Sequence, residues 1–235
     1  MTPLIIREHD SVWVVRDDLF PGGTKARFLP MLLEGVEEAV YASPAEGGAQ
    51  TALATVAKAL GKRATIFVAA RAKLHPRTLE AARLGAKVVP VRPGYLSVVQ
   101  ARAKGYARAS GARLVPFGVD LPEAITLLAE AAISAGLDPD EVWCAAGSGV
   151  LARSLAQAWP RARRHVVQVG RELQANDVAN ATIHIYPRQF SDVAESLPPF
   201  PSDPHYDAKA WEMMTARKGS GRVVFWNVTG HVLSS

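Results

Sequence analysis

The chain alternates short segments rich in valine and isoleucine with longer segments rich in alanine and leucine, and this alternation constrains its fold most. The short apolar runs indicate strands near residues 12–16, 38–42, 64–69, 87–91, 113–116, 141–146, 164–169, 181–186 and 222–227. The longer amphipathic stretches indicate helices near residues 24–35, 48–60, 76–85, 95–110, 121–135, 150–159 and 205–217. Strands separated by helices predict an α/β fold with a mainly parallel sheet and helices on both faces.

Prolines interrupt this alternation in two places. Pro30 lies beyond the first turn of the first predicted helix, so we expect a kink or an early end there. The stretch 170–204 is polar and then carries four prolines within residues 198–204. Because such a run continues neither a helix nor a central strand, this stretch is predicted to be an extended connector.

Composition excludes several classes of protein. The single cysteine, Cys144, rules out an internal disulfide framework and favours a cytoplasmic location, and its apolar strand predicts a packed side chain. No apolar run approaches about 20 residues, so we expect no membrane-spanning helix, and the N-terminus shows no signal-peptide pattern. The six histidines show no paired metal spacing, so no metal site is expected. The net charge of +5 leaves nucleic-acid association as a weak alternative, because the basic cluster at 161–165 lacks aromatic residues.

A glycine pair, Gly22 and Gly23, follows the first predicted strand and precedes Thr24 and Lys25. The glycines let the backbone turn sharply, and Thr24 can cap the helix that follows. Lys25 would then lie at the positive end of the helix dipole and near Arg27, which raises the cost of its charge and predicts a lowered pKa. A lysine of lowered pKa suits Schiff-base chemistry, and the alternative is a solvated lysine in a surface turn.

A second glycine pair, Gly47 and Gly48, lies between the strand predicted near 38–42 and the next helix. Backbone N–H groups at such a turn can hold an anion such as a carboxylate, and Gln50 and Thr51 would add hydrogen bonds. A tight structural turn with Thr51 as its cap explains the same residues equally well.

The third glycine site follows the strand predicted near 141–146. Gly147 and Gly149 let the backbone approach an oxyanion, the helix start supplies N–H donors and Ser148 supplies a hydroxyl, which predicts a phosphate cradle. The nucleotide P-loop pattern is absent, the dinucleotide fingerprint lacks a glycine at Ala152, and no glycine stands two residues before or after Ser148 as a nucleophile elbow requires. A phosphate-binding domain with unrelated chemistry stays an alternative.

In this order, the three glycine sites resemble the pyridoxal-phosphate enzymes of the tryptophan-synthase β-like fold, nearest the 1-aminocyclopropane-1-carboxylate deaminase and D-cysteine desulfhydrase branch. The similar segments are Arg-Asp-Asp-Leu at 16–19, Gly-Gly-Thr-Lys-Ala-Arg at 22–27, Gly-Gly-Ala-Gln-Thr at 47–51, and the segments 81–86, 203–210 and 224–230. The resemblance implies a larger cofactor lobe, reduced here, at residues 1–36 and 117–235, and a smaller substrate lobe at 37–116.

The resemblance also implies a role for each site. Lys25 would hold pyridoxal 5′-phosphate in a Schiff base and then serve as the general base for an α-proton. Thr51 would be the hydroxyl on the substrate side, and Thr229 would lie near the pyridine nitrogen. The expected cofactor-binding residues are Lys25, Gly147, Ser148, Gly149, Val150, Leu151 and Thr229, and the expected substrate-carboxylate residues are Gly47, Gly48, Ala49, Gln50 and Thr51.

The chain departs from the family pattern around these sites. Ala52 stands where the family has an asparagine beside the cofactor hydroxyl, Thr24 replaces the asparagine before the lysine, and Val150 and Leu151 replace a glycine and a threonine. The chain is also shorter around residues 170–204, where the family carries more of its larger lobe. These changes leave Lys25 in place and reduce the number of groups expected to contact the cofactor.

We therefore expect a pyridoxal-phosphate-dependent lyase or deaminase that acts on a small amino acid by elimination, deamination or β-replacement. The resemblance implies a homodimer, and no membrane or metal is expected as a partner. The alternative from a different class is a degenerate relative that binds an anionic metabolite or a partner without chemistry, which Ala52 and the short 170–204 region favour.

Overall fold

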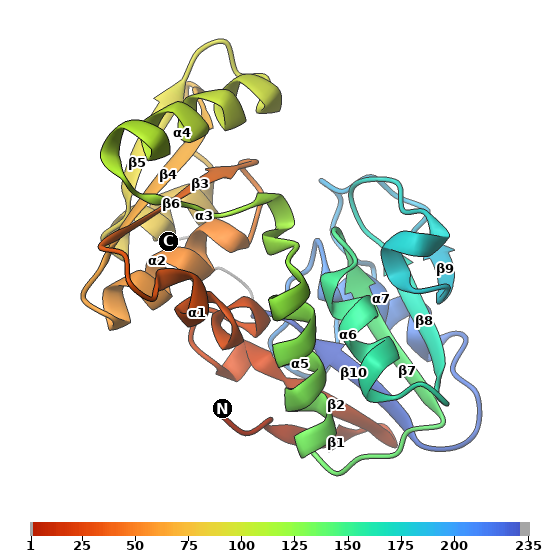
Figure 1. The fold of residues 1–235 in the computed structure, drawn as a ribbon. Helices are drawn as coiled ribbons and strands as arrows, with labels where there is room; N and C mark the ends of the chain where they lie inside the picture. The colour runs from red at the N-terminus through yellow and green to blue at the C-terminus, as the bar shows by residue number, and fades with distance from the viewer. Residues whose placement is uncertain (1, 231–235) are drawn as a thin grey trace. The chain divides into compact units, whose positions relative to one another are not determined.

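The computed structural model describes residues 2–230, and the chain divides into two compact units. Within the described residues, the six-stranded unit contains residues 2–24 and 120–230. The four-stranded unit contains residues 25–119. Each unit is an α/β layer structure, so the expected fold class of mainly parallel sheets flanked by helices is confirmed (Figure 1).

The six-stranded unit is built on a sheet in the order β1-β2-β10-β7-β8-β9. Strand β1 runs antiparallel to β2, and the other neighbouring strands run parallel to each other. The strands are β1 (Ile6–His9), β2 (Val12–Arg16), β7 (Glu141–Ala146), β8 (Arg163–Gln168), β9 (Thr182–Ile185) and β10 (Val223–Asn227). The helices are α5 (Pro122–Ser134), α6 (Val150–Ala158) and α7 (Asp207–Thr215), with short 3-10 helices η1 (Asp17–Leu19) and η4 (Ala175–Val178).

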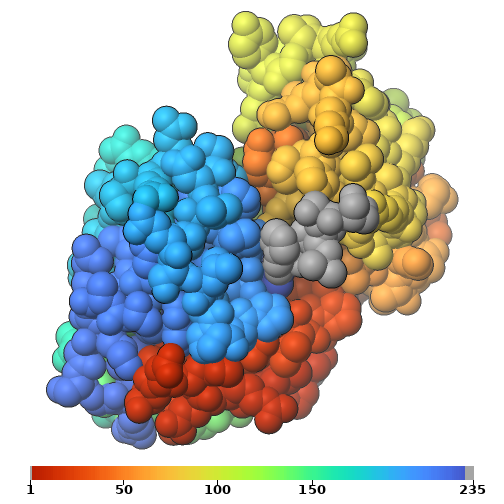
Figure 2. All heavy atoms as spheres, turned by 180° about the vertical axis from the view of Figure 1, so that it is seen from behind, coloured from red at the N-terminus to blue at the C-terminus, as the bar shows by residue number. Residues whose placement is uncertain are grey.

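Strand β10, from the end of the chain, lies between β2 and β7 and joins the two halves of this sheet. Helices α6 and α7 cover opposite faces (Figure 1). On the α7 face, the rings of Trp211 and Phe225 meet edge to face with centroids 5.3 Å apart, beside the fully buried Trp143. Figure 2 shows the N-terminal residues packed directly against the C-terminal segment of the same unit.

The four-stranded unit is wholly parallel, in the order β5-β4-β3-β6. Its strands are β3 (Glu38–Ser43), β4 (Arg63–Ala69), β5 (Lys87–Val91) and β6 (Arg113–Leu114). Its helices are α1 (Leu29–Leu33), α2 (Ala49–Ala59), α3 (Pro76–Arg83) and α4 (Leu96–Ser110), with the 3-10 helices η2 (Thr24–Arg27), which begins at the unit boundary, and η3 (Phe117–Val119). Helix α4 covers one face of the sheet, and α2 and α3 cover the other (Figure 1).

Three details differ from the sequence prediction. The helix expected over 24–35 divides into η2 and α1, and the break falls at Phe28, so Pro30 lies in the first turn of α1, where its missing N–H costs nothing. Strand β1 was not predicted at all. The stretch 170–204 is not a continuous connector, because it contains η4 as well as the predicted strand β9.

No helix within residues 2–230 is long and apolar enough to cross a membrane. The same residues hold no group of three or more histidine, cysteine, aspartate or glutamate side chains that could bind a metal ion.

Candidate functional site

The segment that leads to Lys25 is fixed by a buried network at the end of β2. Thr24 is only 3% exposed, and its hydroxyl donates to Asp17 Oδ2 at 2.7 Å. The indole Nε1 of Trp226, on β10, donates to Thr24 Oγ1 at 2.9 Å and to Asp17 Oδ2 at 3.1 Å. The Thr24 hydroxyl therefore takes part in this network, and the chain enters Lys25 from a rigid point.

The two glycines before Thr24 are required by the backbone. Gly22 and Gly23 have φ angles of +88° and +67°. A Cβ at Gly23 would lie 2.5 Å from the carbonyl oxygen of Val228, which also accepts the Thr24 N–H at 3.0 Å. The turn thus packs its own backbone onto the end of β10, which only glycine permits. Lys25 itself is half-buried and lies in η2.

The glycine turn (residues 147–151) lies at the same edge of the six-stranded sheet. Because β2, β10 and β7 are parallel neighbours, the residues that follow them emerge at one carboxyl edge. Helix α6 begins after Gly149, whose φ is +83° and which offers no side-chain acceptor to the first turn. The N–H groups of that first turn therefore keep their capacity to bind an anion.

Two arginines hold the carbonyl groups of the glycine turn. Arg171 Nε donates to Gly147 O at 2.9 Å, and Arg153 Nε donates to Gly149 O at 3.4 Å. Both guanidinium groups are themselves paired, Arg171 with Asp177 at 3.1 Å and Arg153 with Asp120 at 2.7 Å. Neither arginine was predicted from the sequence to belong to the site, because nothing in the local pattern links it to the turn.

The expected cofactor residue Thr229 follows β10 at this edge. Its N–H donates at 3.2 Å to Asp207 Oδ2, a fully buried carboxylate at the start of α7. Burial raises the pKa of the Cys144 thiol to about 12, and the Asp207 carboxylate adds to the shift. Cys144 is therefore a packed, protonated thiol at neutral pH. Asp207 lies beside Thr229 at the edge of the candidate site, and the sequence segment 203–210 contained this residue without indicating its contact.

The turn of residues 47–51, called the substrate turn here after its expected role, lies at the carboxyl end of β3 in the four-stranded unit. Its own side chains hold it together. Gln50 is fully buried, and its Nε2 donates to Ala45 O at 2.8 Å and to Pro44 O at 3.4 Å. The Thr51 hydroxyl donates to Gly48 O at 2.9 Å. Because the hydroxyl proton of Thr51 is donated to Gly48 O, Thr51 Oγ1 can act toward a ligand only as a hydrogen-bond acceptor.

Arg77 lies against this turn from α3. Its Nη1 is 2.9 Å from the position that a Cβ on Gly48 would take. Gly48 has an ordinary helical backbone, with φ −71° and ψ −15°, so its conformation does not require glycine. Glycine instead leaves room for the guanidinium group of Arg77, which would have to shift if a Cβ were present. Ala52, in place of the expected asparagine, is 2% exposed and adds no polar group.

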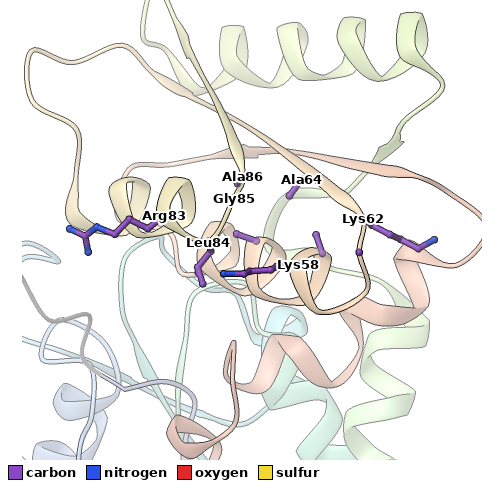
Figure 3. A pocket seen from close by; sticks show the side chains of 10 residues that line it. Lys58, Lys62, Ala64, Arg83, Leu84, Gly85 and Ala86 are labelled. Carbon is purple, nitrogen blue, oxygen red and sulfur yellow. The ribbon is translucent and has the colours of Figure 1, made fainter.

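A separate cavity of about 240 Å³ opens in the four-stranded unit (Figure 3). It lies where α2 and α3 end and β4 and β5 begin, at the sheet edge opposite the substrate turn. Among its lining residues, Lys62 donates through Nζ to the carbonyl groups of Leu33 and Val36, so its charge serves the fold. The cavity is therefore not part of the candidate site.

The residues present suit a cofactor that carries a phosphate group. The N–H groups at the start of α6 are free of side-chain caps, while the carbonyl oxygens of Gly147 and Gly149 are occupied by arginine donors. A turn that presents donors and withholds acceptors favours an anion.

Comparison with known proteins gives a family and a set of related folds. The family described as "Pyridoxal-phosphate dependent enzyme" matches residues 2–223. A solved structure of an ACC deaminase homologue has a TM-score of 0.81 and 19% identity, over 98% of this chain and 90% of its own. The processed form of threonine deaminase isoform 2 from Solanum lycopersicum has a TM-score of 0.69 and 16% identity, over 97% of this chain and 78% of its own.

Diaminopropionate ammonia lyase from Escherichia coli in its apo form has a TM-score of 0.68 and 15% identity, over 98% of this chain and 83% of its own. At these identities the likeness shows the fold, and the tryptophan-synthase β-like fold expected from the sequence is confirmed. A comparison with curated proteins gives no match.

Proposed function

The chain belongs to the family of pyridoxal-phosphate dependent enzymes, and we propose that it acts on a small amino acid by elimination, deamination or β-replacement. One observation carries the proposal. The backbone anchor of Lys25 and the glycine turn lie at the same carboxyl edge of the six-stranded sheet, on neighbouring or next-neighbouring strands. Ligands of parallel α/β sheets bind at this edge.

Lys25 is proposed as the residue that holds the cofactor and moves the α-proton. When bound, pyridoxal phosphate supplies an electron sink for the charge left on the substrate α-carbon. The chain supplies the rest. The network of Thr24, Asp17 and Trp226 fixes the backbone from which the Lys25 amine reaches the reacting atoms. A base held by so rigid a backbone spends little free energy on orientation.

The glycine turn is proposed to bind the phosphate group of the cofactor through Gly147, Ser148, Gly149, Val150 and Leu151. The main donors are backbone N–H groups, because Val150 and Leu151 carry no hydroxyl and are buried. Thr229 is proposed to lie near the pyridine nitrogen, with its backbone held by Asp207.

The substrate turn is proposed to bind the carboxylate of the amino acid. Helix α2 begins at Ala49, and Gly48 before it supplies no side-chain cap, so the first N–H groups of the helix can donate to a carboxylate. Arg77, beside Gly48, adds a guanidinium group, whose planar donors match a carboxylate. Thr51 contributes its hydroxyl oxygen as an acceptor on the substrate side, because its proton is donated to Gly48 O.

A panel of small amino acids tests the reaction. The purified protein with pyridoxal phosphate is incubated with both enantiomers of serine, cysteine, threonine and diaminopropionate and with 1-aminocyclopropane-1-carboxylate. Release of ammonia, sulfide or a keto acid from at least one of them, abolished by Lys25→Ala, is the expected result. No turnover of any member by the cofactor-loaded protein would contradict the proposed reaction.

A second candidate is a relative that binds an amino acid or another anionic metabolite without chemistry. The buried apolar side chain of Ala52 favours it, since the position carries no donor for the cofactor. Saturable amino-acid binding to the loaded protein with no product would support this alternative.

We also propose that the protein is a homodimer, on the basis of the family resemblance. We propose a cytoplasmic location because its single cysteine, Cys144, is buried and forms no disulfide. Sedimentation of the purified protein at several concentrations tests the dimer.

A further inference from the structure

The guanidinium group of Arg171 joins three segments at the carboxyl edge of the six-stranded sheet. It leaves the loop after β8, donates through Nε to Gly147 O at 2.9 Å and pairs through Nη2 with Asp177 Oδ1 at 3.1 Å. Nη1 donates to Glu172 O at 3.3 Å within its own loop. One side chain therefore connects the glycine turn after β7 with the η4 segment.

The contact with Gly147 fixes more than one carbonyl group. A peptide unit is planar and trans, so a fixed Gly147 C=O also fixes the N–H of Ser148 on the opposite side of the same plane. Glycine residues otherwise allow this plane to rotate over a wide range. Arg171 thus determines in which direction the first donor of the turn points.

The contact with Asp177 controls the other end of the turn. A Cβ on Gly149 would overlap the backbone oxygen of Asp177, so the η4 segment packs directly onto Gly149. The Asp177 side chain accepts the N–H of Gln174 at 2.9 Å, which closes a capping box around η4. Arg171 holds this closed segment against the turn.

We propose that Arg171 is the positioning residue of the phosphate site, which it orients through Gly147 and Asp177 without touching the phosphate group. The opposing explanation is a charge effect, in which any cation at this place would attract the phosphate. The ion pair with Asp177 offsets the charge of Arg171, so geometry is the larger contribution. The proposal rests on the assignment of the glycine turn as the phosphate site.

The experiment compares the affinity of pyridoxal 5′-phosphate with that of pyridoxal, which lacks the phosphate group, by absorption titration. In Arg171→Gln, the dissociation constant of pyridoxal phosphate is expected to rise by about ten- to a hundredfold, while that of pyridoxal stays unchanged. Arg171→Lys keeps the charge but loses the fork of donors, so it should behave like Arg171→Gln. The control is Arg161→Gln, whose side chain is 85% exposed and pairs with Asp138 away from the turn.

A second probe does not depend on Lys25. Inorganic phosphate is titrated into isotope-labelled protein, and the Ser148 amide signal is followed by NMR. A saturable shift in the wild type that weakens in Arg171→Lys and in Asp177→Asn supports the proposal. Equal loss of both cofactor forms in Arg171→Gln, full rescue by Arg171→Lys, or an unchanged phosphate titration would each overturn it. A Ser148 shift without cofactor binding to Lys25 would contradict the Lys25 assignment and leave the positioning role intact.

Discussion

The glycine turn and the substrate turn have the same local architecture but are held in opposite ways. Each follows a buried parallel strand and starts a helix on an uncapped glycine. The substrate turn is braced from within, by the side chains of Gln50 and Thr51. The glycine turn is braced from outside, by Arg171 and Arg153.

The difference shows which residues each turn leaves for a ligand. External bracing takes up the carbonyl oxygens of Gly147 and Gly149 and leaves the backbone N–H groups, which suits a phosphate group. In the substrate turn, the side chains of Gln50 and Thr51 are engaged in hydrogen bonds to the turn itself. The charged group available to select a carboxylate is therefore the neighbouring guanidinium group of Arg77. The two turns therefore use glycine for different reasons. Gly149 is needed for its positive φ and for its contact with Asp177, whereas Gly48 leaves room for a guanidinium group.

The largest effect is expected from Gly149→Ala. The new Cβ would overlap the Asp177 carbonyl oxygen, and the alanine would have to adopt a φ of +83°. Because overlap and backbone strain add, the folded state should lose about 3 kcal/mol or more. Thermal unfolding measures the loss, and cofactor titration should show no saturable binding. A melting temperature equal to that of the wild type would show that the η4 segment does not press on the turn.

Gln50→Ala should have the next largest effect. The substitution removes the amide that holds the Ala45 and Pro44 carbonyl groups, at a cost of about 1–3 kcal/mol. Because this bracing belongs to the substrate turn, the affinity for pyridoxal phosphate should stay within about twofold while amino-acid binding weakens. Urea unfolding and cofactor titration measure the two quantities. Loss of cofactor affinity as large as the loss of amino-acid affinity would remove the distinction between the turns.

Gly48→Ala is the counterpart of Gly149→Ala in the substrate turn, and the structure should tolerate it. The backbone is helical at Gly48, and the atom displaced is the end of a flexible side chain, so stability should change by less than about 0.5 kcal/mol. The displaced Arg77 should raise the KM for the amino-acid substrate about tenfold, and Arg77→Gln should match it. An unchanged KM in both variants would exclude Arg77 from substrate binding.

Much of this arrangement could be predicted from the sequence, because strand and helix periodicity and the three glycine sites are local patterns. Strand β1 was missed because its alternation is weak and its hairpin turn contains no glycine. That turn uses Asp10 and Ser11 at φ angles of +50° and +59°. Arg171 and Arg77 were missed for another reason. Their contacts with Gly147 and Gly48 form only when separate βα units pack side by side, and local sequence carries no signal for that.

The smallest effect concerns pH. The Gln174 N–H and then Arg171 hold the pKa of Asp177 below its ordinary value of 3.8. A carboxyl group with a lower pKa in the folded state stabilises that state above its unfolded pKa, and the contribution disappears as pH falls through the folded value. The bracing of the glycine turn should therefore be constant from about pH 8 to about pH 5 and weaken only below about pH 3.8.

The measurement is the difference in melting temperature between the wild type and Asp177→Asn across this range. That difference should stay constant down to about pH 5 and shrink only in stronger acid. A difference that already shrinks between neutral pH and about pH 5 would mean that another group controls the η4 segment.

Lys25, as the residue that holds the cofactor, is the central assignment for this protein. The measurement is borohydride reduction of the protein incubated with pyridoxal phosphate, followed by peptide mapping with mass spectrometry. Reduction fixes the cofactor on the amine that carries it, so the pyridoxyl mass should appear on Lys25 and vanish in Lys25→Ala. Stoichiometric label on another lysine, such as the buried Lys209, or no label at all, would contradict the account.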